Sequence, residues 1–336
     1  MTKLLSALLL SGCLLTRVSL ACEPLTVEHF HLGSVSAAPH HPATQGALLL
    51  MGGGDRSFAA LRWFFAHAGH GKIVVLSASY GQEIGEQFYQ DIGGISAVDT
   101  LVFHDRTAAY DACVIDLISH ADGIFIAGGD QARYIRYWKN TPVSALLDAH
   151  VRAGRPLAGT SAGLAMLGEV VYGALDDGSL TSSEAIAAPT GPATTLTSDF
   201  LHLDLLQHVI TDTHFKERDR FGRLLAFISK YQATDALVHT PLHGLGVDEA
   251  AAVGVDAQGV ARVFTEHAQA GAWWVESVQW REDASHSLNG AVARVAHLGV
   301  HSTLNLPAGQ VSQPLEWLTF TVTHDQVVMT PSKAAE

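Results

Sequence analysis

Apolar runs alternate with stretches of helical composition over the first half of the chain. The runs 46–51, 72–78, 100–103 and 123–127 are mostly apolar, and each precedes a segment with helix-like spacing of its apolar residues. Strands that are apolar at nearly every position are typical of a parallel sheet covered on both faces. The pattern predicts an α/β fold with a doubly wound, mostly parallel sheet. Helices are expected at 58–67, 83–92, 110–119, 131–139 and 142–153.

The pattern changes in the second half of the chain. The polar stretch 176–198 is expected to be a long loop, and 205–211 a strand. From residue 244 the apolar runs are short and separated by turns, which predicts an antiparallel edge to the sheet. We therefore expect an α/β domain over 46–267 and a β-rich C-terminal appendage over 268–336.

The N-terminus has the composition of a secretory signal peptide. Lys3 precedes an apolar stretch that ends near Ser19-Leu20-Ala21, a small-x-small cleavage pattern. We expect a signal peptide over 1–21, a linker containing several Pro and His residues over 22–45, and a secreted or periplasmic location. The remainder of the sequence has no stretch long and apolar enough to span a membrane.

The chain has three cysteines, Cys13, Cys22 and Cys113. Either of the first two is a position at which a lipoprotein anchor would fit. Cleavage after residue 21 leaves Cys22 and Cys113, which can pair in an oxidising compartment. Because Cys113 belongs to an apolar helical stretch, a buried free thiol is the favoured interpretation. The spacing of the cysteines is not that of a metal site.

The formal net charge of −13 limits the function classes. An acidic chain is a poor general binder of nucleic acid or of anionic membranes, and it is compatible with a cationic substrate. Hydrophobic residues make up 48% of the chain and charged residues 16%, so most of it is expected to be folded.

Gly159-Thr-Ser-Ala-Gly163 lies between an apolar run and a helical stretch. G-x-S-x-G at a strand-to-helix turn is typical of a nucleophile elbow, which exposes the serine hydroxyl at the carboxyl end of the sheet. Nucleophilic serine catalysis also needs a base. His214 follows a predicted strand, beside Asp212 and a predicted helix that bears Arg218, Arg220 and Arg223.

Several motifs occur together in one order: Gly128-Gly-Asp-Gln131, the elbow, Asp212-Thr-His-Phe215 with its arginines, and Gly244-Leu-Gly-Val-Asp-Glu249. This set closely resembles peptidase family S51, the cyanophycinases and related exopeptidases, over residues 46 to 265. The resemblance implies a flavodoxin-like, class I glutamine-amidotransferase-like fold and a serine-dependent peptidase. Cyanophycinases release β-Asp-Arg dipeptides from cyanophycin, a poly-aspartate with arginine on each side chain.

The resemblance implies roles for individual residues. Ser161 is the expected nucleophile, His214 the base, and Glu184 the acid behind it, with Asp176 and Asp177 as competitors. The backbone N–H groups of Gly129 and Ala162 are the expected oxyanion hole. The expected substrate contacts are Asp130, Gln131, Arg218, Arg220, Arg223 and Glu249; for Glu249 a structural role, and for the arginines a salt-bridged surface, stay open.

The expected function is a serine-type exopeptidase acting on an Arg- and Asp-rich peptide, through an acyl-enzyme, with neither metal nor other cofactor. The alternatives are an aspartyl or isoaspartyl dipeptidase of the same family and a catalytically silent secreted binding module. Thr213 replaces the Gln often found between Asp and His in cyanophycinases, which leaves the substrate detail open. A homodimer also stays open.

Overall fold

The computed structural model describes residues 26–34, 43–234, 241–281 and 286–332. The predicted signal peptide over 1–21, with the cleavage and lipidation positions Cys13 and Cys22, lies outside these described residues.

Most of the described strands belong to a ten-stranded sheet whose centre is parallel. The pairs β4–β3, β3–β5, β5–β6 and β6–β2 are parallel, and antiparallel strands extend the sheet on both sides. In spatial order the strands are β1 Val27–Gly33, β4 Ala97–Phe103, β3 Lys72–Ser77, β5 Gly123–Ile126, β6 Leu157–Thr160, β2 Ala47–Met51, β11 Ala251–Asp256, β12 Val260–Thr265, β15 Thr303–Asn305 and β16 Gln310–Ser312.

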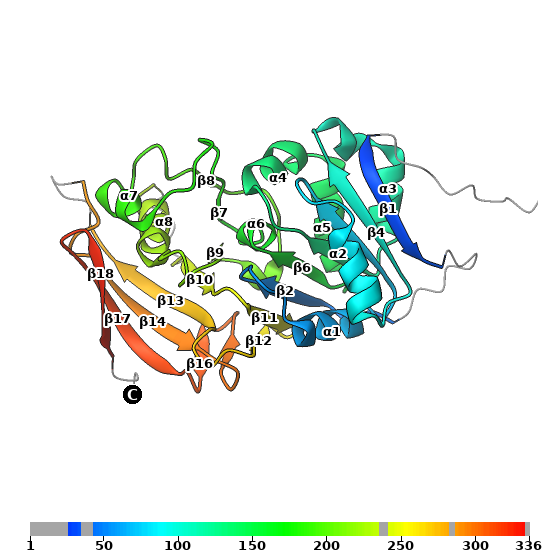
Figure 1. Cartoon of the computed structure of the whole chain (residues 1–336). Helices are drawn as coiled ribbons and strands as arrows, with labels where there is room; N and C mark the ends of the chain where they lie inside the picture. The colour runs from blue at the N-terminus through cyan, green and yellow to red at the C-terminus, as the bar shows by residue number, and fades with distance from the viewer. Residues whose placement is uncertain (1–25, 35–42, 235–240, 282–285, 333–336) are drawn as a thin grey trace, which may run out of the picture.

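Helices cover both faces of the parallel centre, which confirms the doubly wound α/β fold (Figure 1). Alternate residues of β2 separate the two cores: Leu49 packs with α1, α2 and η1, whereas Leu48 and Leu50 pack with α3, α4 and α5. The helical segments are α1 Phe58–His67, α2 Glu83–Glu86, the π-helical η1 Gln87–Ile92, the 3₁₀ turn η2 Thr107–Tyr110, α3 Ala112–Ser119, α4 Gln131–Trp138, α5 Pro142–Arg152, α6 Ala162–Ala165, α7 Ser182–Ala187, the 3₁₀ turn η3 Asp204–Leu206 and α8 Phe221–Thr234. The expected loop 176–198 therefore contains α7, and also β8 Leu196–Thr197, which pairs with β7 Val171–Tyr172.

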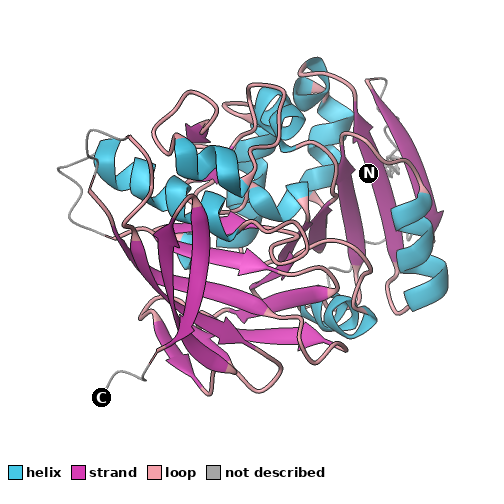
Figure 2. Cartoon of the chain, turned by 60° about the vertical axis from the view of Figure 1, so that its left-hand side comes forward, coloured by secondary structure: helices cyan, strands magenta, loops and turns pink. Residues whose placement is uncertain are grey.

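A second, six-stranded sheet lies beside the first, with helices gathered on one side of it (Figures 1 and 2). Its strands in spatial order are β18 Gln326–Pro331, β17 Glu316–Thr323, β14 Val292–Leu298, β13 Ala272–Gln279, β10 His243–Val247 and β9 Val209–Asp212. The pair β9–β10 is parallel, and the remaining pairs are antiparallel. Phe221 and Phe227 of α8 pack on this sheet together with Phe320.

The described residues after 267 are β-rich, as expected, but the sheets do not divide at residue 267. Strands β13, β14, β17 and β18 extend the sheet that begins with β9 and β10, and β15 and β16 extend the large sheet beyond β12. The expected antiparallel edge is also divided, because β10 lies in the second sheet whereas β11 and β12 lie in the first. The C-terminal extension is thus hydrogen-bonded into both sheets.

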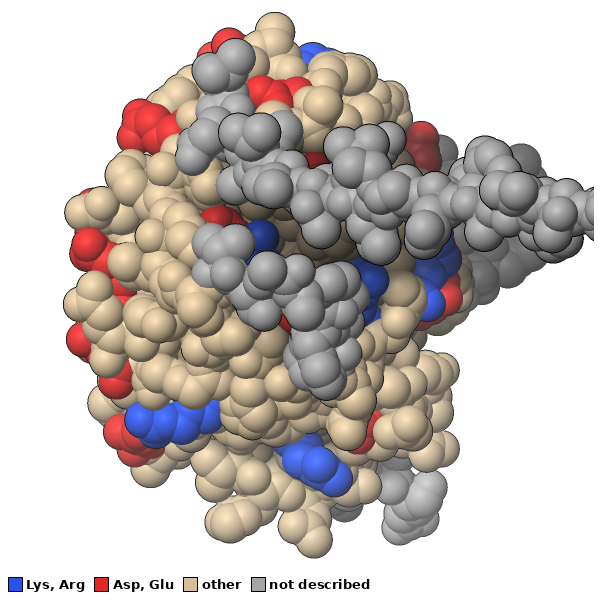
Figure 3. Space-filling view, turned by 90° about the vertical axis from the view of Figure 1, so that its right-hand side faces the viewer, with Lys and Arg blue, Asp and Glu red and all other residues tan. Residues whose placement is uncertain are grey.

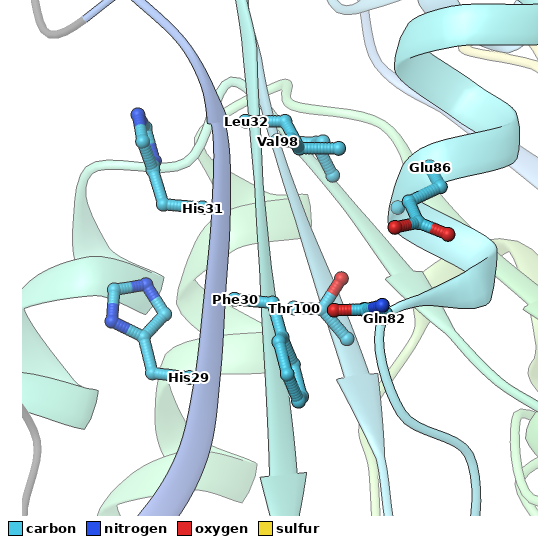
Figure 4. A pocket seen from close by; sticks show the side chains of 9 residues that line it. His29, Phe30, His31, Leu32, Gln82, Glu86, Val98 and Thr100 are labelled. Atoms are coloured by element: carbon cyan, nitrogen blue, oxygen red, sulfur yellow. The ribbon is translucent and has the colours of Figure 1, made fainter.

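The predicted linker over 22–45 contains a strand, so this part of the prediction is wrong. Strand β1 pairs antiparallel with β4 at the edge of the large sheet. Its residues alternate: Phe30 and Leu32 lie on the side of α2, beside a cavity of about 240 Å³, and His29 and His31 lie on the other side (Figure 4). Both histidines contact the buried Asp99 carboxylate, at 2.7 and 2.8 Å, so they attach the strand to β4. The alternation of polar and apolar residues in 29–32 was the sequence signal for this strand.

Cys113 is disulfide-bonded, which overturns the preference for a buried free thiol. The two other cysteines of the sequence lie outside the described residues. Cys113 is partly exposed near the start of α3, where Asp111 caps the helix and accepts from its backbone N–H at 2.8 Å. The apolar pattern of α3 is accounted for by Val114 and Ile118, which are the buried residues of the helix.

Within the described residues, the helices are all too short or too polar to cross a bilayer. The same residues contain no group of three or more His, Cys, Asp or Glu side chains placed to hold a metal ion. On the face seen in Figure 3, basic side chains form small separate groups among acidic and uncharged ones, so this face carries no continuous basic patch.

Candidate active site

Ser161 lies at a sharp turn between β6 and α6. Its backbone has φ 52° and ψ −120°, a conformation that is strained for a residue with a side chain. The two glycines of the motif leave no room for a Cβ, since one on Gly159 would lie 2.4 Å from the carbonyl oxygen of Gly163, and one on Gly163 2.3 Å from that of Ile126. Strand and helix can therefore approach closely, and the turn has the geometry of a nucleophile elbow.

The structure connects Ser161, His214 and Glu249 by two consecutive hydrogen bonds. The Oγ atom of Ser161 lies 2.7 Å from Nε2 of His214, and Nδ1 of His214 lies 2.5 Å from Oε1 of Glu249. In this arrangement the serine hydroxyl donates to Nε2, and Nδ1–H donates to the carboxylate. It is the arrangement of a serine nucleophile, a base and an orienting acid.

The turn after β2, residues 52–57, packs against the imidazole of His214 and holds its backbone. Gly53 has φ 112°, and a Cβ there would lie 2.3 Å from Cε1 of His214. The backbone N–H of His214 donates to the carbonyl oxygen of Gly52 at 2.8 Å. A Cβ on Gly54 would lie 3.2 Å from Oε2 of Glu249, so the same turn also borders the acid.

The pKa of His214 is lower than that of an ordinary histidine. Burial of the imidazole is the largest cause, and the hydrogen bond to Glu249 opposes it. The positive charges of Arg218 and Arg220 lower the pKa further. The imidazole is therefore neutral at neutral pH, as a general base must be.

Glu184 does not lie at His214, and the place expected for it is taken by Glu249. Glu184 forms a capping box at the start of α7: its carboxylate accepts from the hydroxyl of Thr181 at 2.7 Å and from the Thr181 backbone N–H at 2.9 Å. The competing Asp177 pairs with Arg136 at 2.7 Å on the surface, and Asp176 is exposed. The acid is therefore reassigned to Glu249.

Two of the three expected substrate arginines are buried structural groups. Arg223 is 2% exposed and holds the buried Asp212 carboxylate through Nε at 2.8 Å and Nη2 at 2.5 Å. Arg220 donates to the backbone oxygen of Thr213 at 2.8 Å and to its hydroxyl at 2.9 Å, and burial lowers the pKa of Arg220 to about 10. Both guanidinium groups are buried, and their hydrogen bonds to Asp212 and Thr213 fix the segment that carries His214.

Arg218 differs from the other two arginines because its side chain is 53% exposed. Its Nε lies 4.0 Å from Oε1 of Glu249, so it is the arginine that borders the triad. Arg218 and Arg220 precede α8 instead of lying on it, and only Arg223 belongs to the helix. The prediction that one helix bears all three arginines is therefore wrong for Arg218 and Arg220.

The remaining predicted residues lie in the turn after β5 and at the start of α6. Asp130 is the N-cap of α4 and accepts from the backbone N–H of Ala132 at 2.8 Å, so its side chain has a structural partner. Gln131 is the first residue of α4 and is half-buried. Gly129 has φ 124° in this turn, and Ala162 is the buried first residue of α6. Their expected role as an oxyanion hole remains a prediction.

Comparison with known proteins shows the family of this chain. Residues 77–262 match the family model of peptidase family S51. The chain belongs to peptidase family S51. It is 30% identical over 244 residues to a cyanophycinase of Synechococcus elongatus, which covers 69% of this chain and 70% of that relative. A cyanophycinase of Trichormus variabilis is 29% identical over 218 residues, covering 62% of this chain and 66% of the length of that relative.

Among solved structures, the chain is similar to a peptidase from an acI-B1 Actinobacterium, with a TM-score of 0.45 and 19% identity, over 67% of this chain and 90% of that one. The family predicted from the motifs is thus confirmed, and with it a peptidase of the hydrolase class. The matched segment contains Ser161, His214 and Glu249, and ends before β13.

Proposed function

We propose that this S51 peptidase is a serine exopeptidase that resembles cyanophycinase and releases β-Asp-Arg dipeptides from cyanophycin. The observation that carries the proposal is the line of short contacts from Ser161 through His214 to Glu249. The relatives named cyanophycinase support the substrate class.

In the proposed mechanism, His214 takes the proton of the Ser161 hydroxyl as the oxygen attacks the main-chain carbonyl carbon of an aspartyl residue, and the bond from each β-carboxyl group to arginine stays intact. Glu249 stabilises the imidazolium that forms and keeps Nε2 directed at the serine. The imidazolium then protonates the leaving amine, which leaves an ester on Ser161. Water, deprotonated by His214, hydrolyses this ester and restores the serine.

The developing oxyanion needs hydrogen-bond donors that are in place before the reaction. The backbone N–H groups of Gly129 and Ala162 are the proposed donors. Their turns lie next to the nucleophile, since a Cβ on Gly128 would lie 3.3 Å from Cβ of Ser161. Gln131, in the same turn as Gly129, is the proposed polar contact for the substrate.

The test is the variant Ser161→Ala, assayed by release of β-Asp-Arg from cyanophycin. We expect loss of activity by a factor of about 10⁴ or more, because a triad acts as a unit. Thr160→Ser, one residue away, is the control for disturbance of the elbow. Hydrolysis by Ser161→Ala at the rate of the unchanged protein would rule out the serine mechanism.

Two measurements separate the proposed function from its alternatives. An active-serine phosphonate probe should label Ser161, and failure to label it would favour a silent binding module. Release of β-Asp-Arg from cyanophycin should exceed hydrolysis of Asp-Leu-type dipeptides, and the reverse order would favour a dipeptidase of the same family.

We also propose that the protein is exported to a secreted or periplasmic location. The N-terminal sequence and the disulfide at Cys113 support this, because disulfides persist in oxidising compartments. Mass spectrometry of the mature N-terminus tests cleavage after residue 21 and lipidation at Cys13 or Cys22 in one measurement. An intact Met1 would contradict export by this signal.

A further inference from the structure

The turn after β2 carries an arginine whose guanidinium has no acidic partner. Arg56 lies three residues after Gly53, the residue that packs on the imidazole of His214. Its Nη1 donates to the side-chain oxygen of Gln87 at 2.8 Å, and its Nε is buried with no hydrogen-bond partner. Within the described part of the chain, no carboxylate forms an ion pair with Arg56.

The Arg56 side chain is partly buried, and within the described residues no carboxylate compensates its charge. Desolvation lowers the pKa of Arg56, and the negative charge of an ionised Tyr80 opposes this shift. A partly desolvated cation without a counterion is costly, and a carboxylate of a ligand would supply the missing negative charge. The guanidinium fork of arginine matches a carboxylate in two-point geometry.

Arg56 is connected to the nucleophile by a short series of neighbours. Tyr80, which is 49% exposed, lies near enough to Arg56 for its ionised form to raise the pKa of the guanidinium. A Cβ on Gly129 would lie 3.9 Å from the Tyr80 ring and 2.5 Å from Oγ of Ser79, so this loop borders the turn after β5. That turn in turn touches Ser161 through Gly128. A series of neighbouring residues, Gly128, Gly129 and Tyr80, therefore connects Ser161 to Arg56.

We propose that Arg56 binds a free carboxylate of the peptide substrate. The inference rests on the proposed function, and it adds a specificity residue that the sequence motifs did not indicate. Cyanophycin offers such groups, because every arginine on the poly-aspartate carries a free α-carboxylate. Arg218 borders the triad at Glu249, and Arg56 lies in the turn that contacts His214 through Gly53, so the site would hold its substrate by cations on two different loops.

The experiment measures binding to the Ser161→Ala protein, in which hydrolysis does not interfere. The probes are β-Asp-Arg with both carboxylates free and its two singly amidated forms. We expect Arg56→Met to weaken binding of the free dipeptide about tenfold or more, and to leave one amidated form unaffected. The variant should bind the free and that amidated form equally well. Amidation should then weaken binding to the Arg56 protein by the same factor as the substitution, as a closed thermodynamic cycle requires.

Arg62→Met is the matched control, because Arg62 is exposed on α1, with its guanidinium over Phe58. Arg56→Lys keeps the positive charge but lacks the two-point geometry of a guanidinium. Its affinity for the free dipeptide should lie between that of the unchanged protein and that of Arg56→Met. Equal weakening of all three probes, no weakening, or no measurable binding of the free dipeptide to Ser161→Ala would overturn the role of Arg56. Phosphonate labelling of Ser161 reports on the proposed function separately, since that probe carries no carboxylate.

Discussion

The Nδ1 atom of His214 lies 2.5 Å from Oε1 of Glu249, although 35 positions separate the two residues in the chain. Two neighbouring strands explain the contact. His214 follows β9 and Glu249 follows β10, and the pair is parallel with Asp212 opposite Gly246. Because parallel strands end at the same edge of a sheet, the base and the acid leave that edge side by side.

The two glutamates that compete for the role of the acid give a matched pair of variants. Glu249→Gln should lower kcat by about 10³- to 10⁴-fold, because a neutral amide neither stabilises the imidazolium nor fixes its tautomer. Glu184→Gln should retain both activity and folding, since Gln also completes a capping box. Steady-state hydrolysis of cyanophycin measures both. A larger loss for Glu184→Gln than for Glu249→Gln would return the acid to α7.

The low pKa of His214 predicts the pH profile. The acidic limb of kcat/KM should lie below pH of about 6.5, the ordinary histidine value, because the base must be neutral. Glu249 raises the pKa and Arg218 lowers it. The limb should therefore move to lower pH in Glu249→Gln and to higher pH in Arg218→Met. Shifts in the same direction in both variants would contradict the assignment of His214 as the base.

The support of His214 by Gly53 can be tested with two glycines of positive φ. Gly53→Ala places a methyl group 2.3 Å from the imidazole, so the ring must shift, and kcat should fall about 10²-fold. Gly154 has φ 71° and nothing within 4 Å of the added methyl group. Gly154→Ala should thus lose about 1–2 kcal/mol of stability with unchanged kcat. Equal kcat values for the two variants would show that Gly53 is only a turn residue.

Variants of Arg223 and Arg218 should have different effects, one on stability and the other on substrate binding. Arg223→Met leaves the Asp212 carboxylate buried without its main partner, and should lower the free energy of unfolding by about 3–5 kcal/mol. Arg218→Met changes an exposed side chain, and its stability should stay within about 0.5 kcal/mol while KM rises. Urea unfolding and steady-state kinetics measure the two effects. A stable Arg223→Met protein with a raised KM would restore Arg223 as a substrate ligand.

The pattern of apolar and polar residues predicted most of the helices and strands of the α/β part. The helix at 58–67 ends where expected, and the parallel centre of the sheet follows from its continuous apolar strands. The pattern of β1 was obscured by the prolines and histidines of the polar region to which it belongs. Similarly, the sequence does not reveal that Asp212 is buried, and its two partner arginines therefore looked like ligands.

The acid of the site was missed for a topological reason. Residues 244–247 were expected in an antiparallel edge, which would have directed Glu249 away from His214. The signal that would have found it was the likeness of 209–214 to 243–249, each an apolar strand that ends in polar residues. Two such strands in parallel present their polar ends together. The position of Glu249 thus depended on a strand pairing, which a local pattern does not encode.

The strand that precedes Glu249 has a consequence for the order in which the protein assembles. Strand β10 is hydrogen-bonded to β9 on one side and to β13 on the other, and β13 is followed by β14, β17 and β18. A chain cut at residue 267 would retain the nucleophile, the base and the acid, yet would leave β10 and β12 with open edges, which invite intermolecular pairing. During synthesis the acid would accordingly be fixed late, after the C-terminal strands have emerged, and a truncated peptidase should aggregate before it becomes active.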